Sequence, residues 1–233
     1  MDWTMTVTGE EVTTLVDYCE KNLGDPLLWT VPEGYPNSLA LCIIDSLYST
    51  GSHYSSVVKV IERYRRECGA TNGAGDLLDS IRRAGGARGW ASTIAQNLKP
   101  AHTKPGALLK AEIIEQAAQL MQDNGIDTVP ELVAHVQANG DLLDNDVHRA
   151  WKRLPSQSSG VTYNYLLILA GLPSVKPDRM IFRFLAQALG ESAELDTRRA
   201  AELITKTAEE MNVDPRALDH IAWRAASGRE LVD

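Results

Sequence analysis

The chain has 233 residues, a formal net charge of −8 and a hydrophobic content of 44%. This length suffices for one good-sized domain or two small ones, and the composition is typical of a globular protein. A membrane-spanning helix needs about 20 apolar residues in succession, and the sequence has no such stretch. The first residues show no basic region followed by an apolar core, so we expect neither a membrane span nor a secretory signal, and a cytoplasmic location is the default.

The residues that usually bind metals and cofactors show no characteristic spacing. Cys19, Cys42 and Cys68 form no C-x-x-C pair, which favours reduced thiols over a disulfide or zinc framework. The five histidines lack metal-ligand spacing, and the glycine clusters lack the patterns that bind nucleotides. The sequence therefore predicts no metal ion and no cofactor.

Apolar residues recur at helical spacing along the chain, and no segment alternates as a β-strand does. The first helix is predicted to begin after Thr8 and to end before Gly24. Further helices are predicted at about 36–51, 52–68, 75–84, 90–98, 108–121, 129–138, 145–151, 161–170, 179–189, 195–212 and 215–226. Asp144 or Asn145 is the candidate N-cap of the helix that ends at Trp151. The predicted fold class is all-α, with about ten helices.

The segment from Trp151 to Gly190 carries the most specific pattern in the chain. A helix end is followed by Leu154-Pro155, a short polar hairpin, an apolar helix that ends at Gly171, and Asp178 opening an amphipathic helix. This order resembles the helix-hairpin-helix DNA glycosylase superfamily, the family of endonuclease III and the alkyladenine glycosylases. The resemblance covers about residues 36–190 and is specific over 154–190.

The resemblance implies a fold of two helical lobes, with the hairpin and a catalytic aspartate facing a cleft. One lobe would contain residues 35–155, ending in the hairpin. The other would contain 1–34 together with 160–233. The implied catalytic residue is Asp178.

The hairpin departs from the family pattern at three positions. Lyase-type members read Leu-Pro-Gly-x-Gly-x-Lys, whereas here Ser156 and Ser158 replace the glycines and Gly160 replaces the lysine. Without the amine nucleophile, Schiff-base chemistry is lost, and the resemblance implies at most a monofunctional, hydrolytic glycosylase. Loss of the glycines weakens or alters phosphate binding by backbone N–H groups. No cysteine follows Cys68, so the iron–sulfur cluster of many relatives is not expected.

Asp178 has two compatible interpretations. A carboxylate beneath the anomeric carbon can stabilise an oxocarbenium-like sugar and orient or deprotonate a water molecule. An aspartate that follows a loop is also a very common helix N-cap.

Further candidates for a base pocket or wedge follow from the resemblance. Leu47 or Tyr48 would probe the duplex, and Asp45, His53 or Tyr54 would contact a flipped base. Alternatively, Asp45 forms a salt bridge to a neighbouring helix. Trp151 and Tyr163 flank the hairpin and are candidates for stacking on a base, with packing in the core as the alternative.

Basic residues concentrate around the hairpin and Asp178. Six occur between residues 149 and 183 against a single acidic residue, Asp178, although the whole chain is acidic. Duplex DNA is therefore the predicted partner, unless these charges only solvate helix faces. The predicted DNA contacts are Arg149, Lys152, Arg153, Ser156, Ser158, Ser159, Gly160, Lys176 and Arg179. Two hypotheses result: a monofunctional DNA glycosylase, or a non-catalytic helix-hairpin-helix scaffold that binds DNA or protein.

Overall fold

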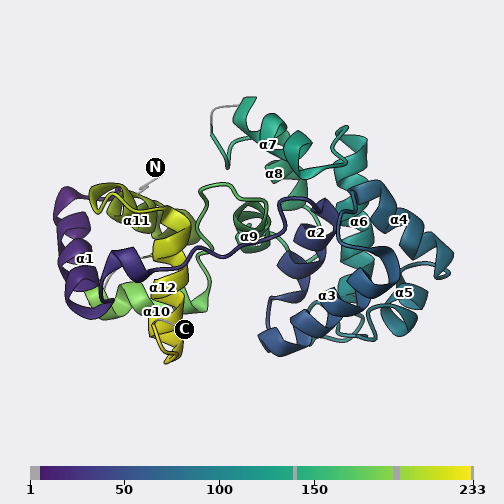
Figure 1. Ribbon diagram of the computed structural model, residues 1–233, viewed down its shortest axis with the longest axis horizontal. Helices are drawn as coiled ribbons and strands as arrows, with labels where there is room; N and C mark the ends of the chain where they lie inside the picture. Colours follow the sequence, from purple (N-terminus) through teal and green to yellow (C-terminus); the bar gives the residue numbers. More distant parts are fainter. Residues whose placement is uncertain (1–5, 139–140, 191–194, 232–233) are drawn as a thin grey trace. The chain divides into compact units, whose positions relative to one another are not determined.

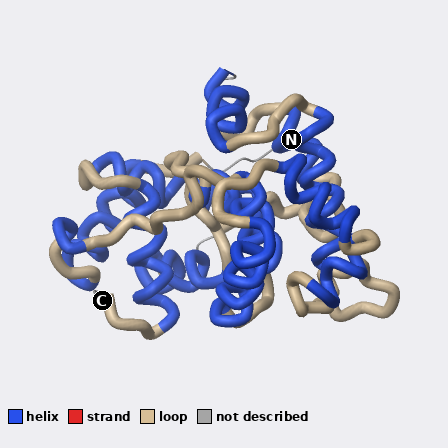
Figure 2. The backbone as a smooth tube through the Cα atoms, turned by 45° about the vertical axis from the view of Figure 1, so that its right-hand side comes forward, coloured by secondary structure: helices blue, strands red, loops and turns tan. Residues whose placement is uncertain are grey.

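The computed structural model describes residues 6–138, 141–190 and 195–231, and its regular structure there is helical (Figure 2). The sole β-type pairing in these ranges is an isolated bridge between Pro100 and Leu109. The predicted all-α class is confirmed. The helices are α1 (Gly9–Asn22), the 3-10 helix η1 (Pro26–Leu28), α2 (Leu39–Tyr48), α3 (Tyr54–Cys68), α4 (Ala74–Arg83), α5 (Ala87–Thr93), α6 (Lys110–Asp123), α7 (Val129–Ala138), α8 (Asp146–Trp151), α9 (Val161–Leu169), α10 (Arg179–Leu189), α11 (Thr197–Glu210) and α12 (Pro215–Ser227).

The chain divides into two compact units (Figure 1). The central unit contains Glu33–Leu172, with α2 to α9; the terminal unit contains the chain up to Pro32 and from Pro173 onward, with α1 and α10 to α12. Residues 160–172 belong to the central unit, which corrects the lobe boundary predicted from the sequence. The reason is that α9 packs against α2. Residues 1–5, 191–194 and 232–233 of the predicted second lobe lie outside the described ranges.

Helix α2 is the centre of the central unit. All ten of its residues are buried, and it packs against α3, α4, α6 and α9. Ser38 caps its start by accepting a hydrogen bond from the Leu41 N–H at 3.2 Å. At its end, the buried ammonium of Lys110 donates to the carbonyl oxygens of Leu47 at 2.8 Å and Thr50 at 2.6 Å. A cation at this position satisfies terminal carbonyls and complements the helix dipole.

The terminal unit is built from amphipathic helices whose apolar faces meet. Leu15 of α1, Phe184 of α10, Leu203 of α11 and Leu218 of α12 are each at most 1% exposed. The predicted start of α1 is confirmed, because Thr8 and Glu11 form a reciprocal capping box. Glu11 also pairs with the buried Arg199 at 2.5 Å, which ties α1 to α11.

Some helix boundaries differ from those predicted. The helix expected at 90–98 runs from Ala87 to Thr93, since Gln96 has a φ of +47° that a helix does not accommodate. The helix expected from residue 36 begins at Leu39, directly after its cap.

Gly34 lies close to the backbone of Leu169, the last residue of α9. Its φ is +61°, and a β-carbon added there would lie 2.2 Å from the carbonyl oxygen of Leu169. The same oxygen accepts a hydrogen bond from the Tyr35 N–H at 2.7 Å. The first residues of the central unit are therefore held against the end of α9.

We predict that Gly34→Ala destabilises the protein by roughly 3 kcal/mol, the sum of about 1 kcal/mol of left-handed strain and about 2 kcal/mol of overpacking. Gly106→Ala is the matched control, because Gly106 also has a positive φ, of +76°, but its β-carbon would enter open space. Urea unfolding of both variants measures the difference. Equal losses would show that the contact with Leu169 relaxes without cost.

Candidate functional site

The turn between α8 and α9 has the backbone of a tight hairpin. The Gln157 N–H donates to the carbonyl oxygen of Leu154 at 3.1 Å, closing a four-residue turn. Pro155 occupies the second position, and Ser156 occupies the third with a φ of +64°. Proline followed by a residue with positive φ is typical of a type II turn, in which the third residue is usually glycine. Ser156 thus keeps a backbone conformation that favours glycine.

Gly160 supplies the second left-handed residue of the hairpin. Its φ is +76°, and its N–H donates to the carbonyl oxygen of Gln157 at 3.0 Å. A β-carbon there would lie 3.3 Å from Nε2 of His148, so even a small side chain needs that ring to move. Gly160 is buried, whereas Ser156, Ser158 and Ser159 are exposed.

A chain of side-chain hydrogen bonds holds the hairpin closed. Nε1 of Trp151 donates to Oγ1 of Thr162 at 2.9 Å, and the Thr162 hydroxyl donates to Oε1 of Gln157 at 2.5 Å. Nε2 of Gln157 then donates to the carbonyl oxygen of Pro155 at 3.1 Å. Trp151 is 0% exposed. The prediction that it stacks on a base is therefore corrected, because its ring belongs to the core and its N–H supports the turn.

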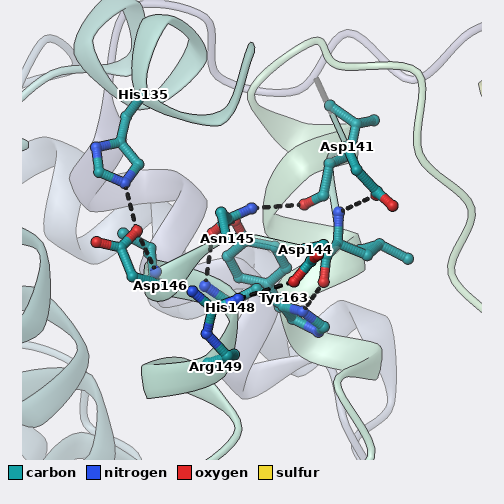
Figure 3. A network of polar contacts seen from close by, with 11 residues as sticks. His135, Asp141, Asp144, Asn145, Asp146, His148, Arg149 and Tyr163 are labelled. Carbon is teal, nitrogen blue, oxygen red and sulfur yellow. Dashed lines mark hydrogen bonds and ion pairs between the residues drawn. The ribbon is translucent and has the colours of Figure 1, made fainter. Parts of the chain in front are cut away.

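A polar network on α8 fixes the other side of the hairpin (Figure 3). Asn145 caps α8 by accepting a hydrogen bond from the His148 N–H at 2.8 Å. Of the two predicted caps, Asp144 and Asn145, the structure therefore selects Asn145. Asn145 also accepts from the Tyr163 hydroxyl at 3.2 Å. Tyr163 is 0% exposed, so it too is a core residue and not a base-stacking one.

His148 packs its ring against Tyr163, with 4.9 Å between ring centroids. Its Nδ1 is hydrogen-bonded to the carbonyl oxygen of Leu143 (Figure 3). Burial lowers the pKa of His148 below its usual value, and the charges of Lys152 and Arg149 act in the same direction. The ring beside Gly160 is therefore neutral at physiological pH.

The predicted DNA contacts of the hairpin differ in availability. Lys152 and Arg153 are exposed. Arg149 is also exposed, but its guanidinium pairs with Asp144 at 2.8 Å (Figure 3). An exposed ion pair is weak, yet it reduces the positive charge that Arg149 presents. Lys152 and Arg153 are thus the stronger candidates for phosphate contacts.

A small pocket of about 120 Å³ opens beside the hairpin. Its lining includes Ser156 and Ser159 from the hairpin, Thr162 from α9, Leu47 and Thr50 at and just after the end of α2, and Lys110. Sequence reasoning missed Lys110, although a lysine at the apolar start of α6 was a visible signal. Its ammonium donates to three backbone carbonyl oxygens, those of Leu47, Tyr48 and Thr50.

The predicted wedge residues are buried. Leu47 is 2% exposed and Tyr48 is 0% exposed, with the Tyr48 hydroxyl donating to the carbonyl oxygen of Asn97 at 3.1 Å. Neither side chain projects from the surface, so their assignment as a duplex probe is corrected. Two other predicted pocket residues, His53 and Tyr54, are exposed, the latter 44% exposed.

Asp45 lies among tyrosines in the central unit. Its side chain is 0% exposed and accepts a hydrogen bond from the Tyr35 hydroxyl at 2.7 Å. Burial raises the pKa values of Tyr54 and Tyr165, and the charge of Asp45 raises them further. The phenols are therefore neutral donors around a buried carboxyl group. The structure gives Asp45 a phenolic partner, and its predicted contact with a base stays a prediction.

Asp178 is the N-cap of α10 in the terminal unit. Its Oδ1 accepts from the N–H groups of Met180 at 2.7 Å and Ile181 at 3.4 Å. The predicted capping role is confirmed. Over the described parts of the chain, no hydrogen bond to Oδ2 is present. Asp178 and Lys176 are half-buried, and Arg179 is exposed.

Asp219 of α12 is a second carboxyl group near Asp178. It is 9% exposed, and its Oδ1 accepts from the Lys176 N–H at 2.9 Å. Burial raises the pKa of Asp219 to about 8; the Lys176 N–H and charge oppose this rise, and the charge of Asp178 adds to it. Sequence reasoning missed this residue. The only signal was an aspartate within the apolar pattern of the last helix.

Residues 6–138, 141–190 and 195–231 contain no group of three His, Cys, Asp or Glu side chains placed to hold a metal ion. None of the helices in these ranges combines the length and apolarity needed to cross a membrane.

Comparison with known proteins identifies the family. A model described as Domain of unknown function (DUF8548) matches residues 13–227, which include the hairpin, Asp178 and Asp219. The chain belongs to this family. No curated protein and no solved structure gives a significant match.

The left-handed conformation of Ser156 predicts opposite effects for two serine-to-glycine changes. Ser156→Gly relieves strain and is expected to stabilise the protein by about 0.5–1 kcal/mol. Ser158→Gly has no positive φ to relieve, so the added freedom of the unfolded chain should destabilise by about 0.5–1 kcal/mol. Thermal and urea unfolding measure both changes. A loss of stability in Ser156→Gly would contradict this account of the hairpin.

Proposed function

We propose that this chain is a monofunctional DNA glycosylase-like enzyme that hydrolyses the N-glycosidic bond of a flipped, damaged or modified base. Asp178 is its catalytic carboxylate, and the hairpin from Leu154 to Gly160 contacts the DNA backbone. The observation that carries the proposal is the geometry of Asp178. One carboxylate oxygen is fixed by two backbone N–H groups, while the other makes no hydrogen bond within the described residues.

This geometry suits an oxocarbenium-like transition state. Hydrolysis of the bond builds positive charge on the sugar, and a positioned carboxylate stabilises that charge. The N–H groups of Met180 and Ile181 orient Oδ1. Oδ2 is then available to face the sugar or to orient a water molecule.

The hairpin supports DNA contact through its backbone. Ser156 and Gly160 hold positive φ values, and the exposed Ser158 and Ser159 lie just before the start of α9. Backbone N–H groups at a helix start can bind phosphates. Lys152 and Arg153 add positive charge beside it. Serine in place of the family's glycines at positions 156 and 158 therefore changes the exposed side chains of the hairpin. The backbone at position 156 still has the left-handed conformation that glycine favours.

The hydrolytic assignment follows from the missing amine. Gly160 stands where lyase-type members of the resembling family have lysine. Lys110 lines the neighbouring pocket, but its ammonium donates to the carbonyl oxygens at the end of α2, and a nucleophile needs a free electron pair. We therefore expect intact abasic sites as product and no adduct after borohydride treatment.

A second candidate function is a non-catalytic helix-hairpin-helix module that binds DNA or protein. The net charge of −8 and the Arg149–Asp144 ion pair favour it. The two functions are distinguished by incubating the protein with a panel of duplexes that carry modified bases. A glycosylase produces abasic sites, which alkaline cleavage detects, whereas a non-catalytic module produces none.

We predict that the double variant Lys152→Ala, Arg153→Ala weakens duplex binding and lowers the slope of log affinity against log salt by about 2. The matched control is Arg82→Ala, Arg83→Ala, which removes two exposed cations from α4. Fluorescence anisotropy at several salt concentrations measures both. Equal effects of the two double variants would indicate that overall charge, and not the hairpin, determines binding.

We predict that Asp178→Asn reduces base excision by on the order of a hundredfold or more, because it removes the charge that stabilises the transition state. Duplex affinity should stay equal or rise, since a carboxylate near phosphates repels them. Single-turnover excision and binding assays measure the two quantities. Asp178→Ala should in addition cost about 1 kcal/mol of stability through loss of the cap.

The control for this prediction is Asp196, the N-cap of α11, which accepts from the Arg199 N–H at 2.7 Å. Asp196→Asn and Asp196→Ala test capping alone in the same unit. Full excision by Asp178→Asn would remove the proposed mechanism and leave Asp178 as a cap.

A further inference from the structure

The segment that carries Asp178 has no helix or strand of its own between α9 and α10. Its backbone folds locally, because the Asp178 N–H donates to the carbonyl oxygen of Lys176 at 2.7 Å. The Lys176 N–H in turn reaches Asp219, which lies 43 residues further along the chain. Helix α12 thus holds the segment through a side chain.

Asp219 is well placed to act as a rigid anchor. Helix α12 packs extensively against α10, the helix that Asp178 caps. Leu218 and Ala222 beside Asp219 are 0% exposed, and Val175 on the segment is 2% exposed. The carboxyl group therefore lies beside buried apolar side chains, whose close packing restricts its movement.

We infer that Asp219 is a positioning residue for Asp178: its buried carboxyl group anchors the backbone of Lys176 to α12 and thereby fixes the catalytic carboxylate. This inference rests on the proposed function, because it assigns Asp219 to the same reaction. The anchor itself is independent of that function and has its own measurable signature.

The protonation of Asp219 supports this role. Within the described residues, the charged groups that act on its pKa are Lys176 and Asp178. Its pKa of about 8, raised mainly by burial, leaves it neutral at pH 7. The negative charge of Asp178 adds to this rise, because it disfavours a second negative charge nearby. A neutral Asp219 still accepts the Lys176 N–H through its carbonyl oxygen, and it adds no negative charge beside Asp178.

The stability of the protein is expected to depend on pH, because the pKa of Asp219 differs between the unfolded and the folded state. An unfolded aspartate has a pKa of about 3.9, so the folded protein binds the extra proton between about pH 4 and the folded pKa of about 8. The stabilising contribution of the protonated group is fully present below pH 4 and is lost as pH rises toward 8. Above pH 8, an ionised Asp219 would repel Asp178 and disturb the segment.

Two substitutions of Asp219 separate the hydrogen bond to the Lys176 N–H from the ionisation of the carboxyl group. Asp219→Asn keeps an oxygen acceptor for the Lys176 N–H but cannot ionise, whereas Asp219→Ala removes both. Asp196→Asn is the control, since it removes a carboxyl group from a helix cap in the same unit.

The first measurement does not depend on activity. We expect the difference in unfolding free energy between the wild-type protein and Asp219→Asn to fall between pH 5 and pH 8. The corresponding difference between the wild-type protein and Asp196→Asn should show no such decline. Amide hydrogen exchange at Lys176 should accelerate in Asp219→Ala and stay slow in Asp219→Asn. A pH-independent stability difference, or unchanged exchange in Asp219→Ala, would overturn the inference even if the protein excises bases.

The second measurement is the pH profile of excision in the full chain. Asp219→Ala is expected to lower kcat on the order of tenfold with little change in DNA affinity, as for a misplaced catalytic group. Excision by Asp219→Asn should fall less steeply than that of the wild type between pH 7 and pH 9. Identical pH profiles with a confirmed anchor would make Asp219 purely structural and overturn the positioning role.

Failure of the proposed function has a different signature. If no duplex in the panel is cleaved by the wild type, the glycosylase assignment fails. The stability and exchange measurements then still decide whether Asp219 anchors the segment.

Discussion

The hydrogen bonds from Trp151 to Thr162 and from Thr162 to Gln157 are the interactions on which the candidate DNA-binding surface depends. They lie inside the central unit, where Trp151 is fully buried, and buried hydrogen bonds of this kind are costly to leave unmade. They hold the turn closed so that Ser156 keeps a left-handed conformation that an isolated serine disfavours. The surface of the hairpin is thus determined by side chains beneath it.

Asp178 and Asp219 in the terminal unit differ in burial, and this difference separates their proposed roles. Asp178 is half-buried and receives two N–H groups at a helix start. Asp219 is buried, and its raised pKa keeps it protonated at neutral pH. Burial is the main cause of this raised pKa, and the charge of Asp178 adds to it. The same residue type can therefore serve as a helix cap in one position and as a buried anchor in the other.

The corrected assignments have a common physical cause. Leu47, Tyr48, Trp151 and Tyr163 are large side chains beside the end of α2 or the hairpin, where family resemblance places a wedge or a pocket. All four are at most 2% exposed. Residue type and proximity to a motif do not reveal which face of a short helix meets the core, because α2 and α9 are apolar on nearly every side.

The sequence by itself determined the helical class, most helix positions and the caps at Thr8 and Asp178, because periodicity and capping are local. It reduced the cap of α8 to Asp144 or Asn145, and the structure selected Asn145. The spacing from Leu154-Pro155 to Asp178 also identified the hairpin and the helix start after it. Only the tertiary structure decided what is buried, which residues meet across long separations, and that burial raises the pKa of Asp219. Lys110 reaching the end of α2 and Asp219 reaching Lys176 join segments more than 40 residues apart. Such contacts arise from packing between helices, and no local pattern specifies them.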